Sequence, residues 1–211
     1  MEIKTVTVGR GETNCYIVFK RETGEASVID PGAQAERILA VIRENRLQVK
    51  NIFLTHGHFD HILAVQQLKE ATGARVVIHR DDADCLVDSH AALYSSIMSE
   101  PFRAVPADVC LVGGERTAVG DVEAEFIHTP GHTPGSVCII MDNVIFTGDT
   151  LFAGDVGRTD LPGGDRRELA MSLRVLAMLP HDYIIYPGHG SPTTLGMEKE
   201  NNEYMRRAAI L

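Results

Sequence analysis

One short segment of the chain, THGHFDH at positions 55–61, concentrates side chains that bind metal ions. Imidazole nitrogens and carboxylate oxygens are good ligands for zinc, iron and manganese. The segment follows the apolar run NIFL, and a loop at the end of a strand presents successive side chains from a rigid base. This pattern predicts a metal site whose candidate ligands are His56, His58, Asp60 and His61.

Ligand-type side chains recur after three further apolar runs, each time beside a glycine. His132 lies in TPGHTPGS, Asp149 in FTGDT and His189 in PGHG. A single histidine in such a place is more often structural than a ligand, but four strand ends that all carry ligands predict one shared site. The remaining histidines lack this context and are predicted to be surface or core residues: His79, His90, His128 and His181.

The elements that must position these side chains alternate between strand and helix patterns. Runs rich in β-branched and aromatic residues predict strands at 2–8, 14–20, 25–30, 49–56, 75–79, 109–112, 117–120, 121–130, 136–141, 143–149 and 183–187. Apolar residues at helical spacing, together with a polar C-terminal segment, predict helices at 35–45, 62–73, 166–179 and 197–211. The less periodic stretch 81–106 is predicted to hold a short helix and a long loop. Strands mixed with covering helices predict an α/β fold of two packed sheets with helices outside, in one domain spanning residues 1–211.

Composition excludes several classes of protein. The chain of 211 residues is 44% hydrophobic and 23% charged, which is typical of a globular protein and excludes a disordered or collagen-like chain. Lys and Arg number 20 against 29 Asp and Glu, and this net charge of −9 argues against a nucleic-acid or anionic-membrane partner. No apolar run approaches the roughly 18 residues of a membrane span. The four cysteines form no CxxC pair, which predicts a reducing, cytoplasmic location.

The ordered motifs HxHxDH, GHTPG, GDTLF and GHG resemble those of the metallo-β-lactamase superfamily of binuclear metallohydrolases, from about Gly9 to His189. The resemblance implies an αββα four-layer sandwich of two mixed sheets with helices on the outer faces. It also implies two divalent metal ions, with zinc expected and iron or manganese as alternatives. The implied ligands are His56, His58 and His132 for one ion, Asp60, His61 and His189 for the second, and Asp149 as a bridge between them.

Three longer segments narrow the resemblance to one branch of the superfamily. TPGHTPGSV, GDTLFAGDVGRTDLPGGD and YPGHGSPTTLGMEKENN are similar to the hydroxyacylglutathione hydrolases (type II glyoxalases), especially the short bacterial ones. The implied activity is hydrolysis of a thioester such as S-lactoylglutathione, with a small-molecule thioester or ester as the partner. Full-length members append a helical region that helps to hold glutathione, whereas this chain ends at Leu211, so glutathione recognition stays open.

The predicted chemistry needs no serine or cysteine nucleophile. Two dications lower the pKa of a shared water from about 15.7 toward neutrality, and the resulting hydroxide attacks the substrate carbonyl. Asp149 is expected beside this hydroxide, and Asp60 is expected both to bind an ion and to orient the hydroxide, so both are predicted catalytic residues.

Neighbouring residues carry weaker predictions. Arg158 is predicted to pair with a substrate carboxylate, with a salt bridge to Asp160 or Asp165 as the alternative. Thr55 and Thr150 adjoin ligands and are candidates for hydrogen bonds to them; ordinary turn hydroxyls are the alternative.

Other functions fit the same motifs. The loop GRTD is also similar to that of the persulfide dioxygenases, oxidoreductases that use a single iron held by two histidines and one aspartate. A lactonase or another small-ester metallohydrolase, and a metal-binding protein without activity, are further alternatives.

Overall fold

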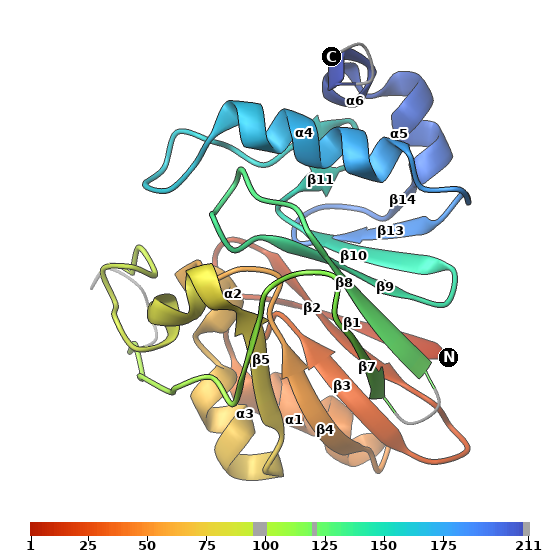
Figure 1. Cartoon of the computed structure of the whole chain (residues 1–211). Helices are drawn as coiled ribbons and strands as arrows, with labels where there is room; N and C mark the ends of the chain where they lie inside the picture. Colours follow the sequence, from red (N-terminus) through yellow and green to blue (C-terminus); the bar gives the residue numbers. More distant parts are fainter. Residues whose placement is uncertain (95–100, 120–121, 209–211) are drawn as a thin grey trace.

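Two six-stranded sheets pack face to face in the computed structural model of the chain, which describes residues 1–94, 101–119 and 122–208 (Figure 1). The first sheet contains, in spatial order, β1 (Glu2–Val8), β2 (Thr13–Phe19), β3 (Glu25–Ile29), β4 (Gln48–Phe53), β5 (Arg75–His79) and β6 (Val109–Leu111). The second contains β14 (Thr193–Thr194), β13 (Ile184–Pro187), β10 (Val144–Gly148), β9 (Val137–Met141), β8 (Val122–His128) and β7 (Arg116–Val119). Each sheet mixes parallel and antiparallel neighbours.

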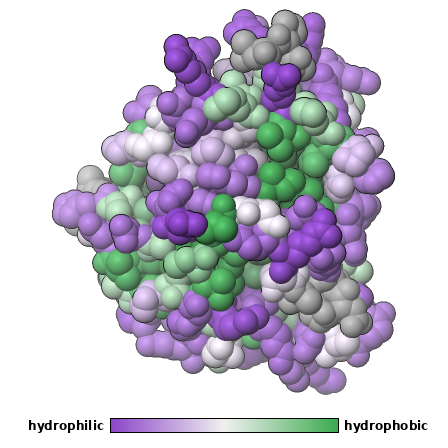
Figure 2. Space-filling view, in the orientation of Figure 1, coloured by the Kyte–Doolittle hydropathy of each residue, from purple (hydrophilic) through white to green (hydrophobic). Residues whose placement is uncertain are grey.

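Helices cover the outer faces of both sheets (Figure 1). On the first sheet lie α1 (Ala35–Glu44) and α3 (Val65–Thr72), and on the second lie α4 (Arg166–Ala177), α5 (Leu195–Asn201) and α6 (Glu203–Ala208). Hydrophilic residues cover much of the face shown in Figure 2, and apolar residues form separate patches on it. The predicted αββα four-layer sandwich is confirmed. No helix in the described part of the chain has the length and apolar character that crossing a membrane requires.

Strand β2 shows how one strand contributes to two apolar layers. All seven of its residues are buried. Successive side chains of a strand point to opposite faces, so Cys15 and Ile17 pack with the helices of the first sheet, while Tyr16 and Val18 pack against the second sheet. Between the sheets, the Tyr16 ring lies 5.1 Å from that of Phe146.

Two predicted helices are broken in the structure. The segment predicted as one helix at 62–73 is divided into α2 (Phe59–Ile62) and α3, with Leu63 and Ala64 between them. The single C-terminal helix predicted at 197–211 is wrong, because Asn202 is extended and separates α5 from α6. Its side-chain oxygen accepts a hydrogen bond from Tyr204 N (3.0 Å), which favours a new helix start. Residues 209–211 of this prediction lie outside the described residues.

The middle of the chain holds one short 3₁₀ helix, η1 (Arg80–Leu86), followed by turns and extended chain. This agrees with the predicted short helix and long loop, of which 95–100 lie outside the described residues. Sequence reasoning missed the small hairpin β11 (Leu151–Phe152) and β12 (Asp155–Val156). These strands are two residues long, too short for any periodic signal.

The two sheets are joined along the edge where the candidate ligands lie. Backbone hydrogen bonds run from Val137 N to Thr55 O (2.8 Å) and from Asn14 N to Gly188 O (2.8 Å). Each bond links the first sheet's side of the molecule to a loop or strand of the second. The loops that follow β4, β8, β10 and β13 therefore meet at one place.

Candidate metal centre

The predicted ligands converge into two clusters. The first cluster consists of His56, His58 and His132, and the second cluster of Asp60, His61 and His189; in each, the ligand atoms lie within 4.8 Å of one another. In the first cluster, His58 Nδ1 is 2.8 Å from His132 Nε2. In the second, His61 Nε2 is 3.3 Å from His189 Nε2.

Asp149 lies between the two clusters. One of its carboxylate oxygens is 3.4 Å from His61 Nε2, and the other is 3.6 Å from both His132 Nε2 and His189 Nε2. The seven predicted ligands therefore form one constellation, in which Asp149 contacts both clusters.

Hydrogen bonds at the back of four imidazoles fix their tautomers. The Nδ1–H groups of His132 and His189 donate to the carbonyl oxygens of Arg158 and Gly11, both at 2.8 Å. A carbonyl oxygen can only accept, so the Nε2 atom of each ring carries a bare lone pair when the imidazole is neutral. Nδ1 atoms also lie near Thr55 Oγ1 in His56 (3.1 Å) and near Asp30 Oδ2 in His61 (3.0 Å).

Two buried atoms of the constellation have no hydrogen-bond partner. They are His56 Nε2 and Asp149 Oδ1. Leaving a buried acceptor unpaired costs about 1–3 kcal/mol, so such atoms usually have a partner. Several lone pairs turned toward a common centre match what a divalent cation requires. The residues present therefore fit the binding of metal ions.

The comparison with protein families agrees with this geometry. The model of the metallo-beta-lactamase superfamily matches residues 8–189. The chain belongs to this superfamily. The motif order predicted membership, and the match includes most strands of both sheets and every residue of the constellation.

Relatives within the superfamily carry several activities in their names. Hydroxyacylglutathione hydrolase GloC of Haemophilus influenzae is 37% identical over 97% of this chain and 98% of its own length. Three solved structures resemble this chain. The B3 metallo-beta-lactamase BLEG-1 has a TM-score of 0.91 and 34% identity, covering 97% of this chain and 99% of that one. TTHA1623 in a di-iron-bound form has a TM-score of 0.85 and 36% identity (95% and 99% covered), and ETHE1 from Myxococcus xanthus has a TM-score of 0.81 and 32% identity (96% and 84% covered).

Asp30 supports this metallo-β-lactamase constellation and was missed by the sequence reasoning. Its buried carboxylate accepts hydrogen bonds from Thr55 N (2.8 Å) and Thr55 Oγ1 (2.6 Å), in addition to the contact with His61. The prediction that Thr55 contacts a ligand is confirmed through His56. A signal was available, because Asp30 ends an apolar run before Pro31 and a glycine, the same context as the predicted ligands.

Glycines let the ligand loops approach closely. A Cβ atom on Gly188 would lie 2.3 Å from Asp149 Oδ1 and 2.8 Å from His61 Cε1. Gly148 has φ +48°, a conformation that L side chains rarely adopt, and a Cβ there would meet Thr55 Oγ1 at 2.3 Å. These positions require glycine because the neighbouring ligands occupy the space.

Burial keeps the first cluster in its metal-binding protonation state. Burial, and then the neighbouring His132, lowers the pKa of His58 to about 4. Burial likewise places the pKa of His56 well below its ordinary value. A neutral imidazole is the form that binds a metal ion, so both side chains are available as ligands at neutral pH.

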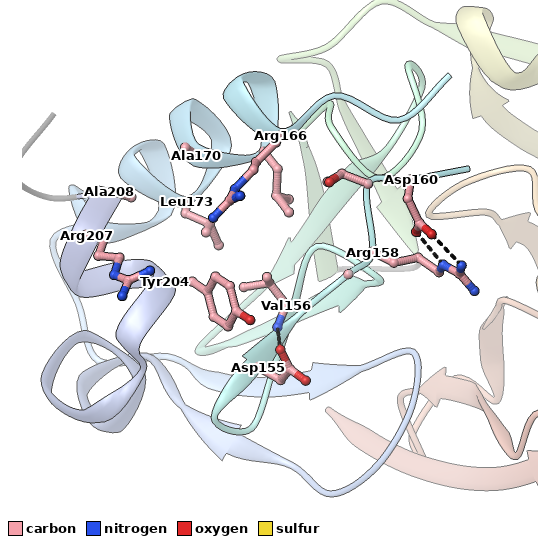
Figure 3. A pocket seen from close by; sticks show the side chains of 13 residues that line it. Asp155, Val156, Arg158, Asp160, Arg166, Ala170, Leu173, Tyr204, Arg207 and Ala208 are labelled. Carbon is pink, nitrogen blue, oxygen red and sulfur yellow. Dashed lines mark hydrogen bonds and ion pairs between the residues drawn. The ribbon is translucent and has the colours of Figure 1, made fainter. Parts of the chain in front are cut away.

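The predictions for Arg158 and Thr150 have different outcomes from the prediction for Thr55. The guanidinium of Arg158 forms two hydrogen bonds of 2.7 Å with Asp160, so the alternative of an internal salt bridge is realised (Figure 3). The backbone oxygen of Arg158 contacts the constellation through His132. Thr150 Oγ1 lies 3.1 Å from Thr129 Oγ1, the turn-type role that was its alternative.

Two other features include none of the seven predicted ligands. A cavity of about 650 Å³ lies beside residues 155–160, between α4 and α6, and none of the seven predicted ligands lines it (Figure 3). His79 and His128, with Asp81, form a further group of ligand-type atoms. Their rings are stacked 4.1 Å apart and 10° from parallel, so their in-plane lone pairs do not converge on one ion. The prediction of structural roles for His79 and His128 fits this geometry.

Proposed function

We propose that the chain is a metal-dependent hydrolase that holds two divalent ions and cleaves a thioester such as S-lactoylglutathione. The observation that carries the proposal is the set of inward-facing lone pairs, two of them buried without a partner. The 37% identity to a protein named hydroxyacylglutathione hydrolase supports the choice of substrate class.

Each residue of the constellation has a role in this proposal. The first cluster would hold one ion and the second cluster the other, and Asp149, which contacts both clusters, would contribute to both sites. Two bound dications would supply hydroxide at neutral pH and polarise the substrate carbonyl. Zinc is the proposed metal, because imidazole and carboxylate ligands suit it; iron binds the same donors, as the di-iron form of the similar TTHA1623 illustrates.

The open side of the constellation is the side of Asp60 and His189. Their side chains are 25% and 27% exposed, whereas those of His61 and His132 are 0% and 3% exposed. Substrate must therefore approach along Asp60, whose free carboxylate lone pairs can accept a hydrogen bond from the attacking water and orient it. The backbone at Gly11 borders this opening, since a Cβ there would lie 3.3 Å from Asp60 Oδ2.

Arg158 stays a proposed contact for a substrate carboxylate. Its pair with Asp160 is exposed, with side-chain exposures of 61% and 69%. Exposed ion pairs contribute little to stability, so a substrate anion can replace Asp160 without a large penalty. The four free thiols support the proposed cytoplasmic location.

The test combines metal analysis with turnover. Purified chain should contain close to two ions and hydrolyse S-lactoylglutathione. His58→Ala should lose at least about 100-fold in kcat/KM, because it removes a ligand of the first cluster, while His181→Ala, at an exposed position, should not. Undiminished turnover by His58→Ala would refute the proposed first ion site.

The main competing function is a persulfide dioxygenase with a single iron. The similarity to ETHE1, at 32% identity and a TM-score of 0.81, favours testing it. One iron per chain, with oxygen uptake on glutathione persulfide and no thioester cleavage, would replace the hydrolase by this oxidoreductase. Metal binding without any turnover on thioester, lactone and β-lactam substrates would leave a metal-binding protein.

A further inference from the structure

A buried carboxylate outside the constellation links two of its loops. Asp82, on η1, is 2% exposed and accepts three hydrogen bonds. Gly57 N (2.9 Å) and Thr133 Oγ1 (2.7 Å) donate to Oδ2, and Gly135 N (2.8 Å) donates to Oδ1. One side chain thus receives donors from two loops that are far apart in the sequence.

Both loops carry ligands of the first cluster. Gly57 stands between His56 and His58, and Thr133 directly follows His132. The Nδ1 atom of His58 and the Nε2 atom of His132 are only 2.8 Å apart, so a shift of either loop changes the distance between two ligand atoms. Asp82 itself belongs to none of the groups of metal-ligand atoms found among the described residues.

Close packing also holds η1 against these loops. A Cβ on Gly135 would lie 2.6 Å from the Asp82 carboxyl carbon, and a Cβ on Gly57 would lie 2.5 Å from the Cβ of Cys85, also on η1. The backbones of both loops can touch the helix only because they carry glycine there. If the Asp82 carboxylate moved, neither loop could move with it without losing its packing against η1.

We propose that Asp82 is a positioning residue, which holds the loops of His58 and His132 at the separation that binding of the first ion requires. The inference rests on the proposed binuclear site and assigns its loop geometry to one side chain. A carboxylate suits this role because it offers only acceptors, so it can gather N–H and O–H donors from two directions. Residues that orient metal ligands through hydrogen bonds typically contribute 10- to 100-fold to metal affinity.

The substitution Asp82→Asn tests this with almost no change in shape. Whichever carboxylate oxygen becomes the NH₂ group, it faces a backbone N–H that cannot turn away, that of Gly57 or of Gly135. One of the two loop contacts must therefore break. Asp84→Asn is the matched control, because it removes the same charge from an exposed position on the same helix.

The measurement is the dissociation constant of each ion, obtained by titrating metal-free protein with Co²⁺ against a chromophoric chelator. We expect Asp82→Asn to weaken the first ion at least about 10-fold and the second less than about 3-fold, with Asp84→Asn unchanged. The cobalt absorption spectrum of partly loaded Asp82→Asn should match that of His58→Ala, which lacks a first-cluster ligand, and differ from that of His189→Ala.

A milder pair of variants covers the case in which Asp82→Asn does not fold. Thr133→Val removes one donor to the carboxylate and should weaken the first ion, whereas Thr133→Ser keeps the hydroxyl and should restore it. Equal weakening of both ions, or wild-type affinity for both, would overturn the positioning role. Failure of the proposed function is a distinct result, since the unaltered chain would then bind fewer than two ions or leave thioesters intact.

Discussion

Asp30→Asn should damage the second cluster by reversing the tautomer of one histidine. Asp30 Oδ1 accepts from Thr55 N, a backbone donor that cannot rotate, so the asparagine must keep its oxygen there. The amide NH₂ then replaces Oδ2, which receives the Thr55 hydroxyl and the Nδ1–H of His61. The hydroxyl can turn and accept, but His61 must move its proton to Nε2, the atom that faces the second cluster.

Two consequences have calculable sizes. An Nε2–H group cannot bind a metal ion, and loss of such an orienting partner typically weakens metal affinity 10- to 100-fold, about 1.4–2.7 kcal/mol. The metal-free protein should also lose about 1–3 kcal/mol of unfolding free energy if His61 keeps its original tautomer against the new donor. Nitrogen-15 NMR of the imidazoles reports the tautomer, and cobalt titration reports the affinity of the second ion.

Asp142→Asn is a closely matched control for this experiment. Asp142 has φ +51° and Asp30 has φ +49°, so any effect of asparagine on a left-handed backbone is shared by the two variants. Asp142 is exposed and lies in the turn between β9 and β10, at the end of β10 away from Asp149, so its variant should behave like the unaltered chain. An Asp30→Asn protein that keeps the Nδ1–H tautomer and binds the second ion within 2-fold of normal would refute the reasoning.

Other sites make separate predictions. Gly188→Ala places a Cβ 2.3 Å from Asp149 Oδ1 and should lower kcat/KM about 100-fold in a turnover assay. Gly190→Ala is the control: its φ is +76° and the space around it is open, so it should cost only about 1 kcal/mol of stability, measured by calorimetry. Glu198→Ala removes a buried acceptor of three hydrogen bonds and should destabilise the chain by about 1–3 kcal/mol in thermal unfolding, with both ions still bound. Burial and then the stacked His128 lower the pKa of His79, so His128→Phe should raise that pKa in an NMR titration yet leave it below 6.5. In the unfolded chain His79 is protonated below a pH of about 6.5, whereas in the folded chain it stays neutral to a lower pH. The free energy of unfolding therefore falls as the pH drops below this value, and it falls less in His128→Phe.

The layers of the fold were predictable because they follow from periodic patterns. The run of β-branched and aromatic residues in β2 and the apolar face of α1 are visible in the sequence, and both elements lie where they were expected. The break at Asn202 was not predictable from periodicity, since the polar segment around it suits one continuous helix. Part of its cause is tertiary: Asn202 Nδ2 donates to Asp155 O (3.1 Å), a contact made only after the chain has folded, in addition to the local contact with Glu198 Oε2 (2.9 Å).

The ligands of the site were more visible in the sequence than their supports. A histidine or aspartate at a strand end beside glycine can be recognised in the sequence by its type and position, and all seven such residues lie close together in the structure. Asp82 gives no such signal, because it lies in the run RDDADC among exposed acidic residues and differs from them only by burial. Arg158 illustrates the opposite case: its side chain attracted the prediction, whereas its backbone oxygen makes the contact with His132.

The carboxylates around the constellation bear on the number of ions. Asp60 and Asp149 face the clusters directly, and Asp30 and Asp82 stand behind them, both 2% exposed. No lysine or arginine side chain is paired to any of these four carboxylates among the described residues, whereas His61 Nδ1 lies 3.0 Å from Asp30 Oδ2 and His61 Nε2 lies 3.4 Å from Asp149 Oδ1. Burial lowers the pKa of His61, but the carboxylates of Asp149, Asp60 and Asp30 outweigh burial and raise it well above its ordinary value, so a proton on His61 offsets part of their charge when no ion is bound. Two divalent ions would offset more of the same negative charge than one ion would, which supports the proposed binuclear site.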